Sequence, residues 1–166
     1  VEEYKSALAC GAIINLDDIT HIDFLEQIAP LPDTICCRYN PGKFNITNDI
    51  MGHLHDTKFG MTHEQILEAF AILKSKGVKH FGIHSMLASC SLVGEYYPRL
   101  ARRLFKCALE IKEKLDINVG FIDLSGGIGI PYKPTDEPVD IFAIGEGVRK
   151  VYEEIIVPSG LEISLF

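Results

Sequence analysis

Short apolar runs alternate along this chain with segments in which apolar residues recur every three or four positions. The short runs are rich in neighbouring β-branched residues, which predicts buried strands at 12–16, 34–39, 80–87, 118–123 and 162–166. The segments between and before them predict helices at 2–10, 19–28, 63–76, 100–115 and 141–155. Strands that alternate with helices in this way favour a parallel sheet with helices packed on its outside.

Residues typical of helix ends support several of these boundaries. Thr62 and Gln65 stand three positions apart, as in a capping box at the start of a helix. Gly77 follows a predicted helix, where glycine is favoured because it adopts a left-handed backbone without strain. Pro158 and Gly160 are expected to end the last helix.

Two arrangements of such a sheet are compatible with the pattern, an open doubly wound sheet and an arc of a (β/α)8 barrel. The predicted strands end in polar, glycine-rich or proline-rich sequence, at 15–17, 38–40, 84–86 and 123–125. Barrels place their chemistry at the carboxyl ends of the strands, so these polar ends favour the barrel. A whole barrel needs roughly 250 residues, so the 166 residues of this chain supply only part of one.

The composition narrows the classes of function. A net charge of −7 argues against a nucleic-acid partner, because a phosphate-binding surface needs an excess of Lys and Arg. The five cysteines are odd in number and include no CxxC pair, so we expect reduced thiols in a cytoplasmic protein. The sequence shows no signal peptide and no apolar run long enough to span a membrane. It begins inside a predicted helix and stops inside a predicted strand, so we expect a piece of a longer protein.

The stretch Ser125-Gly126-Gly127-Ile128-Gly129 directly follows a predicted strand and places three glycines in four positions. Glycines leave backbone amides free to bind an anion. The stretch is not a P-loop, because no Gly-Lys-Ser/Thr follows. It is not a dinucleotide fingerprint either, because GxGxxG is absent. A tight turn and an anion-binding loop both remain open.

Other polar residues have a structural explanation beside the functional one. His84 lies near the carboxyl end of a predicted strand. It is either an acid–base or ring-contacting residue or a core histidine bonded to the backbone. Arg38 ends a strand and needs a partner if it is buried. Asp17 and Asp18 are either ligands of a cation or, as the simpler explanation, caps of the helix that follows.

Residues 43–61 are predicted to form a long loop. His53 and His55 lack the companion ligands of a familiar metal site and are expected at the surface. Lys58 stands beside an aromatic residue and is either a surface charge or an active-site charge.

Four stretches, in this order and spacing, resemble the pyridoxal-phosphate decarboxylases of the alanine-racemase-like barrel class. They are CCRYNPGKF (36–44), DTKFGM (56–61), FGIHSMLAS (81–89) and FIDLSGGIGIPY (121–132). The opening GAIINLDD (11–18) fits as well, and within the class the resemblance is closest to the diaminopimelate decarboxylases. It implies that residues 1–166 are a partial pyridoxal-phosphate-binding (β/α)8 barrel domain, from about the third to the sixth strand plus the start of the seventh.

The resemblance implies pyridoxal phosphate as the cofactor and assigns a site for its phosphate. The family's glycine-rich stretch, which receives the phosphate on backbone amides, falls on Ser125, Gly126 and Gly127. The family's serine that also contacts the phosphate matches Ser89, with Ala88 in the position of a family glycine.

Three further residues are assigned to the cofactor site by the resemblance. Arg38 matches a strand-end arginine close to the cofactor, and His84 matches a family histidine. Met86 stands where the family has a histidine stacked on the ring. Its thioether packs on a ring face but does not ionise.

The resemblance also places essential groups of the family outside these residues. The lysine that joins the cofactor as a Schiff base is expected upstream of Val1. A Glu-x-Gly-Arg motif and a C-terminal β domain are expected beyond Phe166. The catalytic residues are therefore unknown within the chain, and we expect the isolated chain to be inactive. The family enzymes act as homodimers, and the open strand edges of a partial barrel predict self-association.

The activity that the resemblance implies for the parent protein is decarboxylation of an amino-acid substrate, meso-diaminopimelate, to lysine and CO2. Three alternatives remain open. One is a related decarboxylase that acts on carboxynorspermidine, ornithine or arginine. A second is a non-catalytic pyridoxal-phosphate carrier, which Met86 slightly favours. The third is a flavodoxin-like module that binds phosphate at 125–129, and a central reversal of strand order would favour it.

Overall fold

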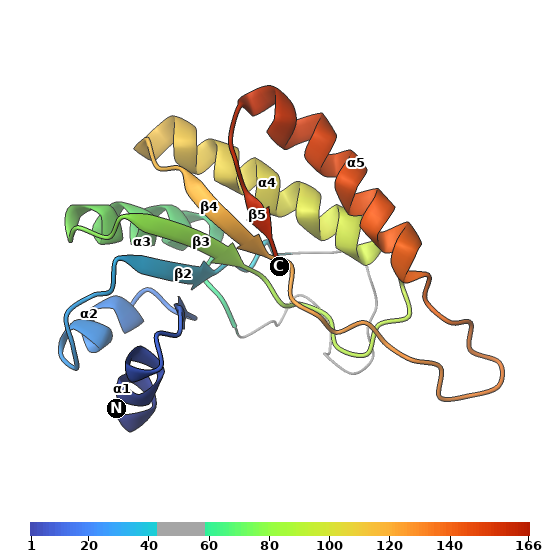
Figure 1. Ribbon diagram of the computed structural model, residues 1–166, viewed down its shortest axis with the longest axis horizontal. Helices are drawn as coiled ribbons and strands as arrows, with labels where there is room; N and C mark the ends of the chain where they lie inside the picture. The colour runs from blue at the N-terminus through green and yellow to red at the C-terminus, as the bar shows by residue number, and fades with distance from the viewer. Residues whose placement is uncertain (43–58) are drawn as a thin grey trace.

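The computed structural model describes residues 1–42 and 59–166 and shows an alternating α/β architecture (Figure 1). Every helix and strand predicted from the sequence is present. Their bounds are α1 Glu2–Ala9, β1 Ile14–Leu16, α2 His21–Glu26, β2 Thr34–Arg38, α3 His63–Ser75, β3 His80–His84, α4 Tyr96–Leu115, β4 Val119–Asp123, α5 Ile141–Ser159 and β5 Ser164–Leu165. The predictions for His53, His55 and Lys58 fall outside the described residues.

The strands form one parallel sheet in the order β1-β2-β3-β4-β5, so each strand lies beside the next one along the chain. A doubly wound sheet requires a reversal of strand order, so the doubly wound and flavodoxin-like alternatives are wrong. Right-handed crossovers between sequential strands place the connecting helices on one face. Figure 1 shows α3, α4 and α5 along one side of the sheet. The parallel α/β class is confirmed, and a partial (β/α)8 barrel is consistent with it.

The helix-covered face of the sheet is apolar because alternate strand residues point toward it. Leu16, Cys37, Ile83 and Ile122 align across four neighbouring strands and are fully buried. They belong to one core with the apolar stripes of α3 and α4, whose buried residues recur at helical spacing. These are Ile66, Ala69, Phe70 and Leu73 in α3, and Leu100, Leu104, Ala108 and Ile111 in α4.

The opposite face carries the alternate strand positions, which form a row across the sheet: Asn15, Cys36, Gly82 and Phe121. The Phe121 ring lies over Gly82, where an added Cβ would stand 2.0 Å from the ring. Asn15 is exposed and Phe121 is half-buried. Among the described residues, this face is therefore the open side of the sheet.

β3 is shorter than predicted because contacts from elsewhere in the chain draw its end away from the sheet. It ends at His84, where the pattern predicted a strand to 87. The Met86 carbonyl accepts a hydrogen bond from Arg38 Nη2 at 2.9 Å, and the Leu87 amide donates to the Tyr96 hydroxyl at 3.2 Å. β1 and β5 likewise cover only part of their predicted runs.

Two helices extend beyond their predicted bounds. α4 begins at Tyr96, one turn earlier than predicted. Pro98 is tolerated there because amides in the first turn have no partner within the helix. α5 continues to Ser159 and includes Pro158, which was expected to end it, and Gly160 follows with a φ of 71°. Within the described ranges, none of the helices is long and apolar enough to cross a membrane.

Local signals predicted the start and end of α3 correctly. The Thr62 hydroxyl accepts from the Gln65 amide at 3.3 Å, and the Gln65 side chain accepts from the Thr62 amide at 2.9 Å. This reciprocal pair is the predicted capping box. Gly77 follows the helix with a φ of 92°, a left-handed conformation that glycine adopts without strain.

The five cysteines are free thiols that burial divides into two groups. Cys10 and Cys90 are exposed, whereas Cys36, Cys37 and Cys107 are buried. Burial raises the pKa of Cys37 and of Cys107 to about 12. We expect a thiol reagent such as Ellman's reagent to modify two thiols rapidly in the native protein and all five after denaturation. Rapid reaction of all five in the native state would contradict this burial.

Candidate functional site

The carboxyl ends of the strands carry a row of polar side chains on the open face of the sheet. Arg38, His84 and Asp123 are aligned in register at the ends of β2, β3 and β4. Asp17, which follows β1, joins this row through an ion pair with Arg38. The row therefore places Arg38 and His84 between two carboxylates at the edge where barrels of this kind place their chemistry.

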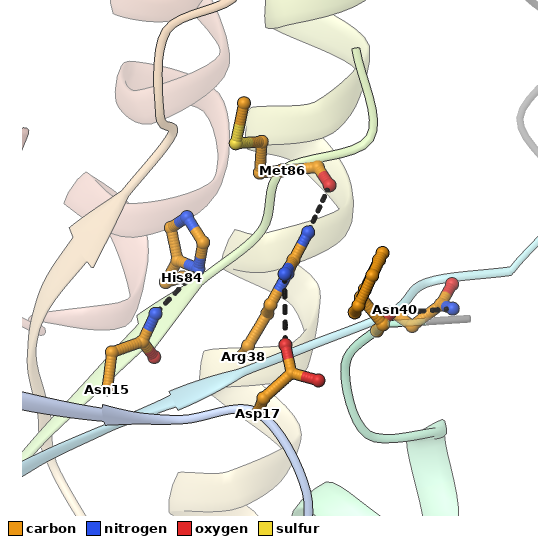
Figure 2. A network of polar contacts seen from close by, with 7 residues as sticks. Asn15, Asp17, Arg38, Asn40, His84 and Met86 are labelled. Carbon is orange, nitrogen blue, oxygen red and sulfur yellow. Dashed lines mark hydrogen bonds and ion pairs between the residues drawn. The ribbon is translucent and has the colours of Figure 1, made fainter. Parts of the chain in front are cut away.

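Arg38 is largely buried and is held from three sides. Its Nη1 donates to Asp17 Oδ1 and its Nη2 to the Met86 carbonyl, both at 2.9 Å (Figure 2). Its guanidinium carbon lies 5.2 Å from the centroid of the Phe59 ring. The prediction that a buried Arg38 needs a partner is confirmed. The prediction that Asp17 caps the next helix is wrong, because its carboxylate pairs with Arg38. The Asp18 carboxylate, by contrast, accepts a hydrogen bond from the backbone amide of Thr20.

His84 is half-buried and has a side-chain partner instead of the backbone partner expected of a core histidine. Its Nδ1 lies 2.9 Å from Nδ2 of Asn15 on β1 (Figure 2). Burial lowers the pKa of His84, the nearby Asp123 carboxylate opposes that shift, and the Arg38 cation adds to it. The lowered pKa favours the neutral imidazole at pH 7.

The lowered pKa of His84 predicts a loss of stability in mild acid. The unfolded chain takes up a proton near pH 6.5, before the folded chain does, so the free energy of unfolding falls as the pH drops below that value. We expect His84→Gln to flatten this decline when thermal unfolding is followed from neutral to mildly acidic pH. His80→Gln, at the exposed start of the same strand, is the matched control and should keep the wild-type decline. Identical profiles for wild type and His84→Gln would contradict the prediction.

The glycine-rich stretch lies against the segment that follows β3. The Ser91 amide donates to the Gly127 carbonyl and the Gly129 amide to the Ser91 carbonyl, each at 2.8 Å. An added Cβ on Gly127 would stand 2.3 Å from the Ala88 carbonyl oxygen, and one on Gly129 2.6 Å from that of Cys90. Close approach of two backbones thus explains glycine at both positions.

The same stretch also presents polar groups that lack a partner. Among the described residues, the amides of Gly126 and Gly127 donate to no acceptor. Ser125 Oγ is buried and has no hydrogen-bond partner among the described residues. An added Cβ on Gly126 would meet nothing within 4 Å, so open space adjoins the loop there. Free amides and a buried hydroxyl are groups that a bound anion satisfies, so the loop fits a phosphate.

The structure brings the residues predicted to hold phosphate together. The Ser89 Cα lies 3.4 Å from the position of a Cβ on Gly127, so the segment after β3 and the loop after β4 share one site. The predicted phosphate cluster is Ser89, Ser125, Gly126 and Gly127. The other residues predicted at the cofactor form a second group, with Arg38 and His84 at the ends of β2 and β3 and Met86 just beyond β3.

Three polar residues near these groups were not assigned to the site from the sequence: Asn15, Asp17 and Asp123. Asn15 interrupts an apolar strand, and the two aspartates stand at or just beyond a strand end. The carboxyl ends of neighbouring parallel strands meet at one edge, so these positions were the available signal. The contacts of these three residues depend on which strands are neighbours in the sheet, and the sequence alone does not give that order.

The chain matches the family described as "Pyridoxal-dependent decarboxylase, pyridoxal binding domain" over residues 1–165. The diaminopimelate decarboxylase of Methanothermobacter thermautotrophicus is 30% identical over 162 residues, which cover 96% of this chain and 38% of that protein. Protein TabA of Pseudomonas amygdali pv. tabaci is 26% identical over 154 residues, which cover 93% of this chain and 36% of that protein.

Solved structures show the same fold. Diaminopimelate decarboxylase from Helicobacter pylori, complexed with L-lysine, superposes with a TM-score of 0.79 at 22% identity, over 98% of this chain and 41% of that one. Lysine decarboxylase from Selenomonas ruminantium superposes with a TM-score of 0.74 at 20% identity, over 98% and 40%. The chain thus spans between 36% and 41% of the length of these relatives.

The comparisons confirm the predicted resemblance to diaminopimelate decarboxylases. They also confirm pyridoxal phosphate as the cofactor of the family to which the matched domain belongs. The match extends over almost every residue and agrees with the parallel sheet and the glycine-rich loop. The chain belongs to the pyridoxal-dependent decarboxylases and matches their pyridoxal binding domain over residues 1–165.

Proposed function

We propose that this chain binds pyridoxal phosphate and contributes that site to a decarboxylase of diaminopimelate. The observation that carries the proposal is the loop after β4, where two free amides and the unpartnered Ser125 hydroxyl adjoin open space. Ser89 lies beside it on the neighbouring segment. Donors of this kind hold a phosphate without any cationic side chain.

We propose that Arg38, His84 and Met86 lie beside the pyridine ring. Arg38 is held in place by Asp17 and the Met86 carbonyl, so its charge is fixed before any ligand arrives. His84 is neutral and is oriented by Asn15. When bound, pyridoxal phosphate supplies an electron sink for loss of a substrate carboxylate. The residues of this chain bind and orient the cofactor and set the charge around it.

The proposed substrate is meso-diaminopimelate, which loses one carboxylate as CO2 and gives lysine. Support comes from the relatives, several of which are diaminopimelate decarboxylases. A related decarboxylase is the second candidate, because a lysine decarboxylase shares the fold. Carboxynorspermidine, ornithine and arginine are the other substrates to compare. The chain covers 38% of the Methanothermobacter relative, so the activity is proposed for the protein that the complete reading frame encodes.

Binding of pyridoxal phosphate and of pyridoxal, which lacks the phosphate, tests the site. The two ligands differ in the group that the loop is proposed to hold, so we expect pyridoxal phosphate to bind at least about tenfold more tightly. Equal affinities would refute the phosphate site. The protein from the complete reading frame is then assayed for CO2 release from each candidate substrate. Tight binding without CO2 release from any of them would favour the non-catalytic carrier.

We also propose that residues 1–166 form one partial barrel domain that pairs with a second copy in the cytoplasm. Among the described residues, β1 and β5 are the edges of the sheet, and such edges pair readily with another chain. Phe166 is 71% exposed and contacts Phe121 on the open face. Free thiols accord with a reducing compartment. Light scattering should give a mass of at least two chains, and a monomer at all concentrations would refute the pairing.

A further inference from the structure

The hydrogen bond between Asn15 and His84 crosses a whole strand. Asn15 lies on β1 and His84 on β3, and β2 runs between them. The register places Cys36 beside Asn15 and Gly82 beside Cys36, whereas His84 is level with Arg38, so the contact runs diagonally and passes small residues at its Asn15 end. This leaves room for the amide to reach the ring on the open face, with Nδ2 2.9 Å from Nδ1.

The chemistry of this pair determines where the imidazole carries its proton. An amide nitrogen donates but does not accept, so the ring nitrogen that faces it must be the acceptor. Burial lowers the pKa of His84, so near neutral pH the ring carries one proton. That proton then resides on Nε2. In Figure 2, Asn15 stands at one side of the ring, and the second ring nitrogen lies on the side away from it.

We infer that Asn15 is a positioning residue, which holds His84 in its Nε2–H tautomer so that the ring presents a hydrogen-bond donor at the carboxyl end of the sheet. The donor on Nε2 suits an acceptor atom of the bound cofactor. This inference deepens the proposed function, because the identity of that acceptor rests on the proposal that the chain binds pyridoxal phosphate. A ring held in the other tautomer would present a lone pair in the same place and would repel such an atom.

Charged groups from the neighbouring elements face His84 but do not orient it. Asp123 on β4 and Asp17 after β1 favour the charged ring, and Arg38 on β2 disfavours it. Asp17 is engaged by Arg38 at 2.9 Å, and the Asp123 carboxylate accepts from a backbone amide at 2.7 Å. In the part of the chain that the structure describes, Asn15 is the side chain bonded to the ring.

Nitrogen NMR of the histidine rings tests the inference directly, because the two ring nitrogens differ in shift according to which one is protonated. Wild-type His84 is expected as the Nε2–H tautomer near neutral pH. In Asn15→Asp the carboxylate only accepts, so the Nδ1 signal should shift to the protonated position and His84 should titrate at higher pH. Asn15→Leu should give a mixture of tautomers. Asn118→Asp, just before β4 and exposed, is the matched control and should leave the His84 signals unchanged.

Cofactor binding is measured on the same variants. We expect Asn15→Asp to weaken pyridoxal phosphate binding about tenfold, the loss that is typical when a residue that orients a metal-ligating histidine is removed. A wild-type ring protonated on Nδ1, or His84 signals in Asn15→Asp identical to those of wild type, would overturn the inference. Wild-type protein with the expected tautomer but no affinity for pyridoxal phosphate would overturn the proposed function and leave the role of Asn15 standing.

Discussion

Replacement of Gly127 by alanine is expected to lower the free energy of unfolding by about 2–4 kcal/mol and to abolish most of the affinity for pyridoxal phosphate. The new Cβ would stand 2.3 Å from the Ala88 carbonyl oxygen, and the φ of 81° strains any residue with a side chain. The atom in the way belongs to the backbone, so the whole segment that carries Ser89 must move. Urea denaturation gives the stability, and titration with pyridoxal phosphate gives the affinity.

Gly126→Ala is the matched variant, one residue earlier in the same loop. An added Cβ at Gly126 meets nothing within 4 Å, so its stability should stay within about 0.5 kcal/mol of wild type. The methyl group would enter the space beside the free amides, so we expect pyridoxal phosphate to bind more weakly although the fold is intact. If both variants bind as wild type does, the loop does not hold the phosphate. If Gly127→Ala is as stable as wild type, the close approach to Ala88 is not present in solution.

The elements that sequence reasoning placed well are those whose ends are determined by nearby residues. α3 begins at a capping box formed by Thr62 and Gln65, three positions apart, and Gly77 closes it. The end of β3 could not be placed in this way. It depends on a hydrogen bond to Arg38, far away in the sequence, and no local pattern reports such a bond.

The same distinction separates the predicted from the unpredicted parts of the site. The glycine-rich loop is visible in the sequence because close backbone approach requires glycine at fixed positions, here Gly127 and Gly129. The partners of Arg38 and His84 are Asp17 and Asn15, on or next to β1, and their role follows from the strand order. A local rule, capping of the next helix, gave the wrong role for Asp17 because it considers only neighbours in the chain.

Replacement of Arg38 by glutamine is expected to lower the free energy of unfolding by about 2 kcal/mol and to weaken binding of pyridoxal phosphate. The change leaves the Asp17 carboxylate without its counter-ion and the Met86 carbonyl without its donor. The side chain of Arg38 is 17% exposed and that of Asp17 34%, so the cost should be below that of breaking a fully buried pair. Urea denaturation and the same ligand titration measure both effects.

Two further variants separate the charge of Arg38 from its geometry. Arg38→Lys keeps the charge, but an ammonium group lacks the planar fork that reaches Asp17 and the Met86 carbonyl together, so its stability should be intermediate. Arg99→Gln is the control, because Arg99 is 57% exposed and pairs with Glu95 at 3.5 Å. It should change the stability by no more than about 0.5 kcal/mol. Equal losses in Arg38→Gln and Arg99→Gln would show that the strand-end network does not stabilise the fold, and a wild-type value for Arg38→Lys would show that charge alone is sufficient.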